Sequence, residues 1–492
     1  MVYDVVIVGG GLGGLVCASI LSTHGLSVLV LEKHQPMGGC LQTVVRHGVN
    51  FDTGMHYVGS MDEGQALYRL FGYMGIADGI PLSRLDPHAY DIIVLEGERY
   101  PYASGYDRFA HTLAQRFPQQ ADQLGEYVRR VRSIAQASPL YDLRLVGSPS
   151  FMEAPCHRIS IDHFVAGITS NPALQAVLLG NMPLYDGVHG LTPAYIHAII
   201  SNSYMQSAFR VVGGSDTIAR ALCRSIERQG GCLRTGTEVV ELLCDDQRMT
   251  AVRLDSGELL MGRRFISTMH PWALMGRIGS PLLRRAYRER IAAVPNSLSN
   301  FTLYLRFKPN SVPYLNSNLF YYHDRDAWAS AYSPERFGRR FMFMHQCHQP
   351  NPSFAQSAVL IAPMAFAEVA RWAHGRGEAG YRELKQQRAE LLIDRLNCIF
   401  PGISAKIEGY HTSTPLTYER YTSTAQGATY GLMRDAGAPE RSYISHRTKI
   451  PNLLLAGQSI TAHGALGVTM GAVVVCADIL GPQLLEQIER WR

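Results

Sequence analysis

A glycine-rich turn lies between a short apolar run and a helical segment within the first thirty residues. Residues 5–8 (VVIV) are all β-branched and apolar, which is typical of a buried parallel strand. Gly9, Gly11 and Gly14 follow at once in the spacing Gly-x-Gly-x-x-Gly, and a second apolar run at 27–31 ends at Glu32. This arrangement predicts a strand–turn–helix–strand unit that binds a dinucleotide.

Each position of this motif has a physical reason. Gly9 permits the tight turn, Gly11 lets backbone amides approach a pyrophosphate, and Gly14 lets the helix pack close to the sheet. The start of the helix directs free N–H groups and a positive dipole end toward the phosphates. Glu32 lies 23 residues after Gly9, where its carboxylate can bind an adenosine ribose and would repel a 2′-phosphate. We therefore expect a dinucleotide without that phosphate.

The rest of the chain alternates between this nucleotide-binding pattern and a different one. Prolines interrupt short segments rich in Tyr, Met and His from about residue 71, with no strand–helix–strand rhythm. The glycine turn and helix return near residue 211, and again at a turn formed by Gly457 and Gln458. We expect a discontinuous nucleotide domain formed by 1–70, 205–270 and 441–492, and a substrate or lid domain formed by 71–204 and 271–440. Within the second domain, the pattern predicts strands at 301–307 and 341–344 and a helix at 383–400.

Composition narrows the class of protein. The chain has 492 residues, of which 46% are hydrophobic, and its net charge is only +5. It is therefore long enough for two cores and not basic enough for a dedicated nucleic-acid binder. Nine cysteines without a Cys-x-x-Cys pair indicate reduced thiols. These thiols favour a cytoplasmic setting. The longest apolar tract, at 468–476, is too short to cross a bilayer, so we expect any membrane contact to be peripheral.

Several motifs resemble one known family. The segments VVIVGGGLGGLVCASIL, VLVLEK, NFDTGMHYVG, FISTMHP and NLLLAGQSITAHGALGVTMGA are similar to those of FAD-dependent carotenoid desaturases, carotenoid isomerases and retinol saturases, which are related to flavin amine oxidases. The likeness runs nearly end to end and is strongest to the retinol saturase branch. It implies an α/β fold: a Rossmann-type FAD-binding domain, like those of glutathione reductase and amine oxidases, with an inserted mixed α+β substrate domain.

The resemblance also implies which residues hold FAD. Those expected at the pyrophosphate and adenosine ribose are Gly9, Gly11, Leu12, Gly13, Gly14, Glu32 and Lys33. The backbone of Val239 is expected to pair with the adenine. Those expected along the ribityl chain, its phosphate and the flavin ring are Gly39, Gly457, Gln458, Gly467 and Val468. Gly467 and Val468 are expected at a helix start, whose dipole favours the anionic reduced flavin.

Reduction of a double bond needs a hydride and a proton, and three residues are candidates to supply or position the proton. His56 and Tyr57 follow the Gly54 turn, and His463 precedes the C-terminal helix. A histidine with a pKa near 6.5 donates at neutral pH, whereas a tyrosine donates only to a strongly basic carbanion. The alternative is that both histidines simply hydrogen-bond the backbone of the turns beside them.

Three aromatic residues either line a tunnel for a polyene or pack in the core: Tyr418, Tyr421 and Tyr430.

Other features bear on metals, electrons and membranes. His345 and His348 lack further ligands at metal-binding spacing, so we expect no metal. Gly213 and Gly214 do not start a second Gly-x-Gly-x-x-Gly motif, which implies that NAD(P)H or a quinone exchanges electrons only transiently. Residues 272–294 combine arginines with apolar residues, which indicates either a solvated helix face or peripheral contact with the inner face of a membrane. The sequence leaves the oligomeric state open.

The expected activity is reduction of a carbon–carbon double bond in a hydrophobic polyene or isoprenoid, in the manner of retinol saturases. Desaturation and redox-neutral cis–trans isomerisation of such a substrate are the near alternatives. A flavin amine oxidase is a more distant one, since no lysine of the later half lies in a recognisable active-site motif. A flavin-binding protein without enzymatic activity is the third class.

Overall fold

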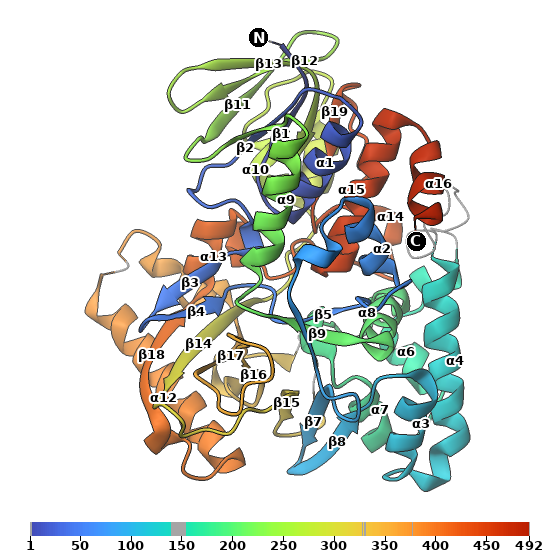
Figure 1. Ribbon diagram of the computed structural model, residues 1–492, viewed down its shortest axis with the longest axis vertical. Coiled ribbons are helices and arrows are strands. Elements are labelled where there is room, and N and C mark those ends of the chain that lie inside the picture. The colour runs from blue at the N-terminus through green and yellow to red at the C-terminus, as the bar shows by residue number, and fades with distance from the viewer. Residues whose placement is uncertain (1, 139–153, 327, 329–330, 376, 492) are drawn as a thin grey trace.

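The computed structural model describes residues 2–138, 154–326, 328, 331–375 and 377–491. Two seven-stranded sheets form its framework, and they lie at opposite ends of the molecule (Figure 1). In the first sheet the strand order is β10-β2-β1-β13-β12-β11, with β19 paired to β13. Its strands are β1 (Val2–Val8), β2 (Val28–Leu31), β10 (Cys232–Arg234), β11 (Val239–Cys244), β12 (Met249–Leu254), β13 (Leu259–Ser267) and β19 (Leu453–Leu455).

The central strand of the first sheet is apolar because both of its faces are covered. Val5 and Ile7 pack with helices α1 (Leu12–Thr23), α9 (Asp216–Arg228) and α15 (Gly464–Leu480), whereas Val6 and Val8 pack against the opposite layer. Strand β1 runs parallel to β2 and to β13, and β13 runs parallel to β19. Helices α1 and α15, from the two ends of the chain, therefore lie side by side on one sheet (Figure 1).

The second sheet has the order β18-β14-β17-β16-β15-β7-β8. Its strands are β7 (Asp91–Leu95), β8 (Glu98–Tyr102), β14 (Ser299–Phe307), β15 (Asn318–Tyr322), β16 (Arg340–His345), β17 (Ser357–Met364) and β18 (Ile407–Ser413). One face packs on the long helix α12 (Ala379–Ile399). The other face packs with α3 (Tyr106–Ala114), α4 (Ala121–Ala137), α6 (Ile161–Ala166), α7 (Pro172–Leu178) and α8 (Ala194–Gln206).

Smaller elements complete the described fold. A three-stranded sheet is formed by β5 (Val58–Gly59), β9 (Ala208–Val211) and β6 (Leu82–Arg84), and a hairpin by β3 (Thr43–Arg46) and β4 (Val49–Asp52). The remaining helices are α2 (Ala66–Tyr73), α10 (Pro271–Met275), α11 (Arg285–Ala292), α13 (Pro415–Thr422), α14 (Pro439–Ser442) and α16 (Gln483–Arg490).

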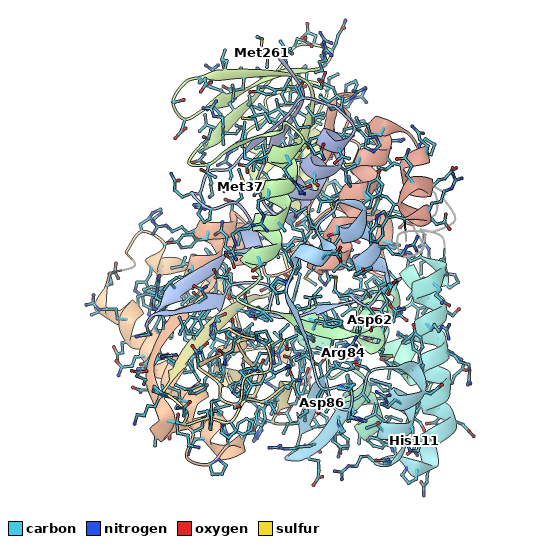
Figure 2. All side chains as sticks on the ribbon, in the orientation of Figure 1. Met37, Asp62, Arg84, Asp86, His111 and Met261 are labelled. Atoms are coloured by element: carbon cyan, nitrogen blue, oxygen red, sulfur yellow. The ribbon has the colours of Figure 1, made fainter. Side chains whose placement is uncertain are left out.

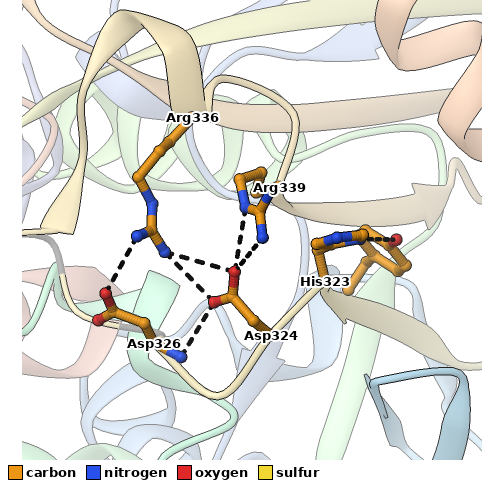
Figure 3. A network of polar contacts seen from close by, with 6 residues as sticks. His323, Asp324, Asp326, Arg336 and Arg339 are labelled. Atoms are coloured by element: carbon orange, nitrogen blue, oxygen red, sulfur yellow. Dashed lines mark hydrogen bonds and ion pairs between the residues drawn. The ribbon is translucent and has the colours of Figure 1, made fainter.

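An ion-pair network fixes the connection after β15 (Figure 3). The Asp324 carboxylate accepts hydrogen bonds from the guanidinium of Arg339, with Nε at 3.0 Å, and from that of Arg336, at 3.2 Å. Arg336 also pairs with Asp326 at 3.3 Å. Because these side chains are partly exposed, water screens the pairs and their contribution to stability is modest. We assign the network a structural role.

The expected α/β fold is confirmed, with two differences in element boundaries. The C-terminal helix begins at Gly464, three residues before the expected start at Gly467. The expected amphipathic stretch 272–294 is divided into two short helices, because the segment between α10 and α11 turns around Arg288, whose guanidinium donates to three backbone carbonyls. All strands of the first sheet lie within the ranges expected for the nucleotide domain, and all strands of the second lie within those expected for the substrate domain. The domain boundaries themselves stay a prediction. Within the described ranges, no helix combines the length and the apolarity that a bilayer span requires.

Candidate active site

The turn between β1 and α1 adopts a conformation that only glycine satisfies. Gly9 has φ +106°, and its N–H donates to the Leu31 carbonyl at 2.8 Å. A Cβ atom on Gly14 would lie 2.1 Å from the carbonyl oxygen of Gly9, so the helix could not approach the strand with any larger residue there. Gly11 caps α1 without a side-chain hydrogen bond. The first N–H groups of the helix are therefore available to a ligand.

Glu32 connects this turn to the strand that follows it. Its carboxylate accepts one hydrogen bond from the N–H of Gly10 and one from the N–H of His34, both at 2.9 Å. A carboxylate offers about four acceptor positions, so capacity remains for ribose hydroxyls. Lys33 points elsewhere: its ammonium donates to the Arg420 carbonyl at 3.3 Å, and burial lowers its pKa.

The C-terminal motif meets the N-terminal turn directly. A Cβ on Gly13 would lie 3.3 Å from the backbone nitrogen of Gly457 and 3.3 Å from a methyl carbon of Val468. Helix α15 has no side-chain cap, so its first N–H groups are also free for a ligand. Gly467 lies one turn inside the helix, and its Cβ would come within 2.7 Å of the Ala462 side chain. This glycine is thus required by the loop that folds back on α15, a role that spacing alone does not reveal.

A single cavity of about 760 Å³ connects these motifs. Of the residues expected to hold the cofactor, its wall includes Gly9, Gly11, Leu12, Gly13, Glu32, Lys33, Gly39, Val239, Gly457, Gln458, Gly467 and Val468. Gly14 lies outside the wall and acts through the packing of α1. The three candidates for proton chemistry also line this cavity: His56, Tyr57 and His463.

Both histidines are held neutral, contrary to the expectation that they titrate near neutral pH. Burial, reinforced by the charge of Arg210, lowers the pKa of His56 to about 3. Burial and Arg434 lower the pKa of His463 to about 4. One ring nitrogen of each, Nδ1 of His56 and Nε2 of His463, is buried without a hydrogen-bond partner in the structure. Neutral imidazoles at these places can accept or donate a hydrogen bond to a ligand, but they are weak proton sources at pH 7.

The cavity extends to the second sheet, where most of its wall is apolar or aromatic; we call this part the chamber. Met342 and Met344 of β16 and Ile361 of β17 form its floor. Other parts of its wall come from Tyr304, Tyr418, Tyr430, Leu184, Ile196, Ile199, Ile200 and Tyr204. Of the three tyrosines singled out in the sequence, Tyr421 lines the other end of the cavity, where its ring lies 5.5 Å from that of His34.

Several residues of the site escaped the sequence analysis. Arg434 lines the cavity and its guanidinium donates to the carbonyls of Ser442, Ser459 and Ile460. Asp91 hydrogen-bonds Tyr57 from beneath the wall at 3.1 Å. Neither residue belongs to a glycine motif. Their positions at the cavity depend on contacts between segments that are far apart in the sequence. His345 and His348, considered for a metal, instead bond the backbone N–H of Leu315 and the hydroxyl of Ser357.

Comparison with known proteins identifies the family. Residues 12–478 match the model of the flavin containing amine oxidoreductases. The chain belongs to this family. It is 27% identical to the human all-trans-retinol 13,14-reductase, over 99% of this chain and 87% of that protein. It is 22% identical to the chloroplastic prolycopene isomerase of Daucus carota, over 99% of this chain and 81% of that one.

Solved structures agree on the fold. Putrescine oxidase bound to putrescine superposes with a TM-score of 0.66 at 16% identity, covering 98% of this chain and 99% of that one. A fatty acid isomerase from P. acnes that produces CLA superposes with a TM-score of 0.62 at 13% identity, covering 97% and 99%. The protein is thus an FAD-dependent oxidoreductase with the architecture of this family.

The residues present fit FAD. The backbones of Gly11 and Gly39 lie against each other, and a Cβ on Gly39 would be 3.1 Å from the Cα of Gly11. The N–H of Gly38 donates to the Gly10 carbonyl at 2.8 Å, which joins the two glycine segments. With no side chains between backbone and cavity, this cradle accepts a pyrophosphate at the N-terminus of α1. The free start of α15 lies at the same cavity and suits the electron-rich edge of a flavin.

Proposed function

We propose that the protein is a flavin oxidoreductase that reduces a carbon–carbon double bond of a hydrophobic polyene or isoprenoid. The observation that carries this proposal is the chamber formed by β16, β17 and α8, which is apolar and continuous with the FAD cradle. Aromatic and aliphatic walls of this kind suit a flat conjugated chain. The retinol reductase and carotenoid isomerase relatives, whose names describe polyene chemistry, support it.

The charges of the cavity argue against an amine substrate. Among the described wall residues, the acidic side chains are Glu32 and Glu238, and both lie near Val239 at the nucleotide end. An ammonium group buried in the chamber would find no carboxylate there, and an unpaired buried charge is strongly unfavourable. The amine oxidases among the solved structures therefore support the fold but do not indicate the substrate.

When bound, FAD supplies hydride transfer. The protein's own contribution is to bind, orient and shield. The glycine cradle and Glu32 hold the dinucleotide, and the N-terminus of α15 stabilises negative charge on the reduced flavin. The chamber positions the double bond and excludes water, and His56, Tyr57 and His463 contact substrate or flavin as hydrogen-bonding groups.

We further propose that the donor of electrons is NAD(P)H or a reduced quinone that docks transiently. The described chain has one dinucleotide turn, at Gly9, and Gly213 and Gly214 form the turn before α9 without a second cradle.

We also propose a cytoplasmic protein in peripheral contact with the inner membrane face, since its substrate dissolves in lipid. The arginine-rich stretch 272–294 is a poor candidate for that contact, because Arg288 and Arg290 bond backbone carbonyls.

Cis–trans isomerisation is the second candidate. It is supported by the carotenoid isomerase relatives and uses the same cradle and chamber without net electron transfer. Analysis of the product separates the candidates, because saturation adds two hydrogens, desaturation removes two, and isomerisation conserves the mass.

The test is anaerobic reduction of the purified flavoprotein, followed by addition of retinoids, carotenoids and other isoprenoids. We expect one polyene class to restore the oxidised flavin band and to gain two hydrogens. Bleaching of the oxidised flavin band by an amine without oxygen, followed by peroxide formation on aeration, would instead favour the amine oxidase alternative.

A further inference from the structure

A buried carboxyl group lies directly behind the wall of the chamber. Asp91, the first residue of β7, has 1% of its surface exposed. The Tyr57 hydroxyl donates a hydrogen bond to its Oδ2 at 3.1 Å, and the Asn318 amide donates one to its Oδ1 at 2.8 Å. Asn318 stands opposite Asp91 in the β7–β15 pairing, so the sheet itself fixes the amide. The side chain therefore has one defined orientation.

Two stacked tyrosine rings separate Asp91 from the chamber. The rings of Tyr57 and Tyr204 have centroids 4.3 Å apart at an interplanar angle of 28°, and both line the cavity. Tyr204 also interacts electrostatically with Asp91. Asp91 is thus one hydrogen bond away from a residue that lines the cavity, although it does not line the cavity itself.

The surroundings of Asp91 favour its protonated form. Arg210 is the cation facing it, and that guanidinium donates to the Ser317 carbonyl at 3.0 Å, while its Nε and Nη1 have no partner in the structure. No ion pair between Arg210 and Asp91 occurs in the described residues. Burial therefore dominates and raises the pKa of Asp91 to about 7 in spite of Arg210 and the two hydrogen bonds. The groups that face it from neighbouring elements are Tyr57, Tyr90, Tyr204, Arg210 and Asn318.

We propose that Tyr57 donates the proton in the reduction of the double bond, and that Asp91 is the positioning residue behind it, which holds and replenishes that proton. This inference rests on the proposed function. The geometry of the Tyr57–Asp91 hydrogen bond carries it, since Tyr57 lines the cavity and, when the Asp91 carboxyl group is protonated, that group can donate through the same bond and leave the Tyr57 O–H for the substrate. His56 and His463, held neutral, are not competing proton sources.

FAD, when bound and reduced by NAD(P)H or a quinol, would supply the hydride to one alkene carbon. The other carbon forms a C–H bond as the O–H bond of Tyr57 breaks, and the phenolate oxygen then takes the proton of the Asp91 carboxyl group. Asp91 is left as a carboxylate and regains a proton from water before the next turnover. The net reaction adds one hydride and one proton to the substrate.

The variants that test this are Asp91→Asn and Tyr57→Phe, with Asp52→Asn as the matched control. Asp52 is also buried, also faced by Arg210, and has its pKa raised to about 6, but it bonds Ser215 and not a wall residue. In the parent, we expect the rate of polyene reduction to fall tenfold per pH unit above about pH 7. Asp91→Asn should lose this dependence and about a hundredfold in rate, and Tyr57→Phe should lose a similar factor. Asp52→Asn should keep the dependence.

Infrared spectroscopy supplies a readout that needs no turnover. We expect a protonated-carboxyl band that titrates near pH 7, disappears in Asp91→Asn and shifts in Tyr57→Phe, where one hydrogen bond is lost. If Asp91→Asn keeps the parent's rate and pH dependence, the inference fails while the proposed function stands. If no polyene reoxidises the parent but the infrared band titrates as described, the proposed function fails. The protonated Asp91 and its hydrogen bond with Tyr57 are then still supported. A band that persists unchanged in Asp91→Asn overturns the inference whatever the activity.

Discussion

Glu32 illustrates how one side chain can serve both the fold and the ligand. Its two carboxylate oxygens hold the N–H groups of Gly10 and His34, and these bonds join the glycine turn to the segment that follows β2. Charge-assisted hydrogen bonds of this kind contribute about 1.5–3 kcal/mol each. Glu32 also lines the cavity and keeps acceptor capacity, so we propose that the same group orders the cradle and contacts the cofactor.

Replacement of Glu32 by Ala should weaken FAD retention by roughly tenfold or more, since it removes charged acceptors from the cradle. The measurement is flavin absorbance per protein after extensive dialysis. Glu241→Ala is the control, because the partly exposed Glu241 side chain pairs with Arg253 and does not line the cavity. Equal flavin occupancy in Glu32→Ala and in the parent would contradict the assigned role.

Spacing alone was sufficient to predict the turn that brings Glu32 and Gly9, Gly11 and Gly13 to the cavity, because that turn depends on backbone geometry close in sequence; their roles toward FAD stay a prediction. Asp91 could not be predicted in this way. Its partners Tyr57 and Asn318 come from two other segments, and only the register of β7 with β15 brings them together. The lowered pKa of His56 also could not be predicted from the sequence, since it depends on burial and on Arg210 of strand β9.

At the scale of elements, the turn between β1 and α1 is the most constrained part of the cradle. Gly14→Ala should prevent flavin binding and lower thermal stability, because the new Cβ would lie 2.1 Å from a backbone oxygen that cannot move aside. Gly279→Ala is the control, since a Cβ there meets no atom within 4 Å. Calorimetry and flavin occupancy measure both effects. A Gly14→Ala protein with normal flavin content would show that α1 does not need to pack so closely.

The chamber of β16, β17 and α8 can be blocked without touching the cradle. Ile361→Phe should reduce affinity for a polyene by tenfold or more while flavin content stays at the parent level, because the larger ring occupies substrate space. Met261→Phe is the control, since Met261 is 48% exposed at the far end of the first sheet, where Figure 2 labels it. Titration of the reduced protein with polyene measures the affinity. An unchanged affinity in Ile361→Phe would place the substrate elsewhere.

Most elements were predictable because their apolar patterns are periodic. Strand β1 and the long helix α12 match the expected positions closely. The start of α15 was predicted three residues too late, because Gly467 suggested a turn while its actual role is to let the helix pack on Ala462. The two short helices α10 and α11 replaced one expected stretch for a similar reason: Arg288 bonds carbonyls that no periodic pattern reveals.

At the scale of the whole molecule, buried histidines make stability depend on pH. Burial lowers the pKa to about 3 for His56, His197 and His345 and to about 4 for His157, His270, His411 and His463. Since the unfolded chain binds these protons near pH 6.5, stability is lost as the pH falls from about 6.5 toward 4. Asp52 and Asp91, with raised pKa values, act in the opposite sense but are fewer.

We therefore expect the Tm of the flavoprotein to fall steadily between about pH 6.5 and pH 4. Thermal unfolding followed by flavin fluorescence and by circular dichroism measures it, at constant ionic strength. His197→Gln offers a specific check, since His197 lies between the hydroxyls of Tyr127 and Tyr185, each at 2.8 Å. The variant should be less stable than the parent at pH 7.5 and differ less from it at pH 5. A Tm that is constant or rises on acidification would contradict this account of the buried histidines.

The two ends of the chain meet at one cavity, and the second sheet supplies the part of its wall that we propose holds the substrate. The most direct test is to reduce the purified holoprotein without oxygen, add a polyene, and follow the flavin band and the mass of the product together. We expect the band to return and the polyene to gain two hydrogens in equal amount. A flavin that stays reduced with every polyene, or a preparation that carries no flavin at all, would contradict it.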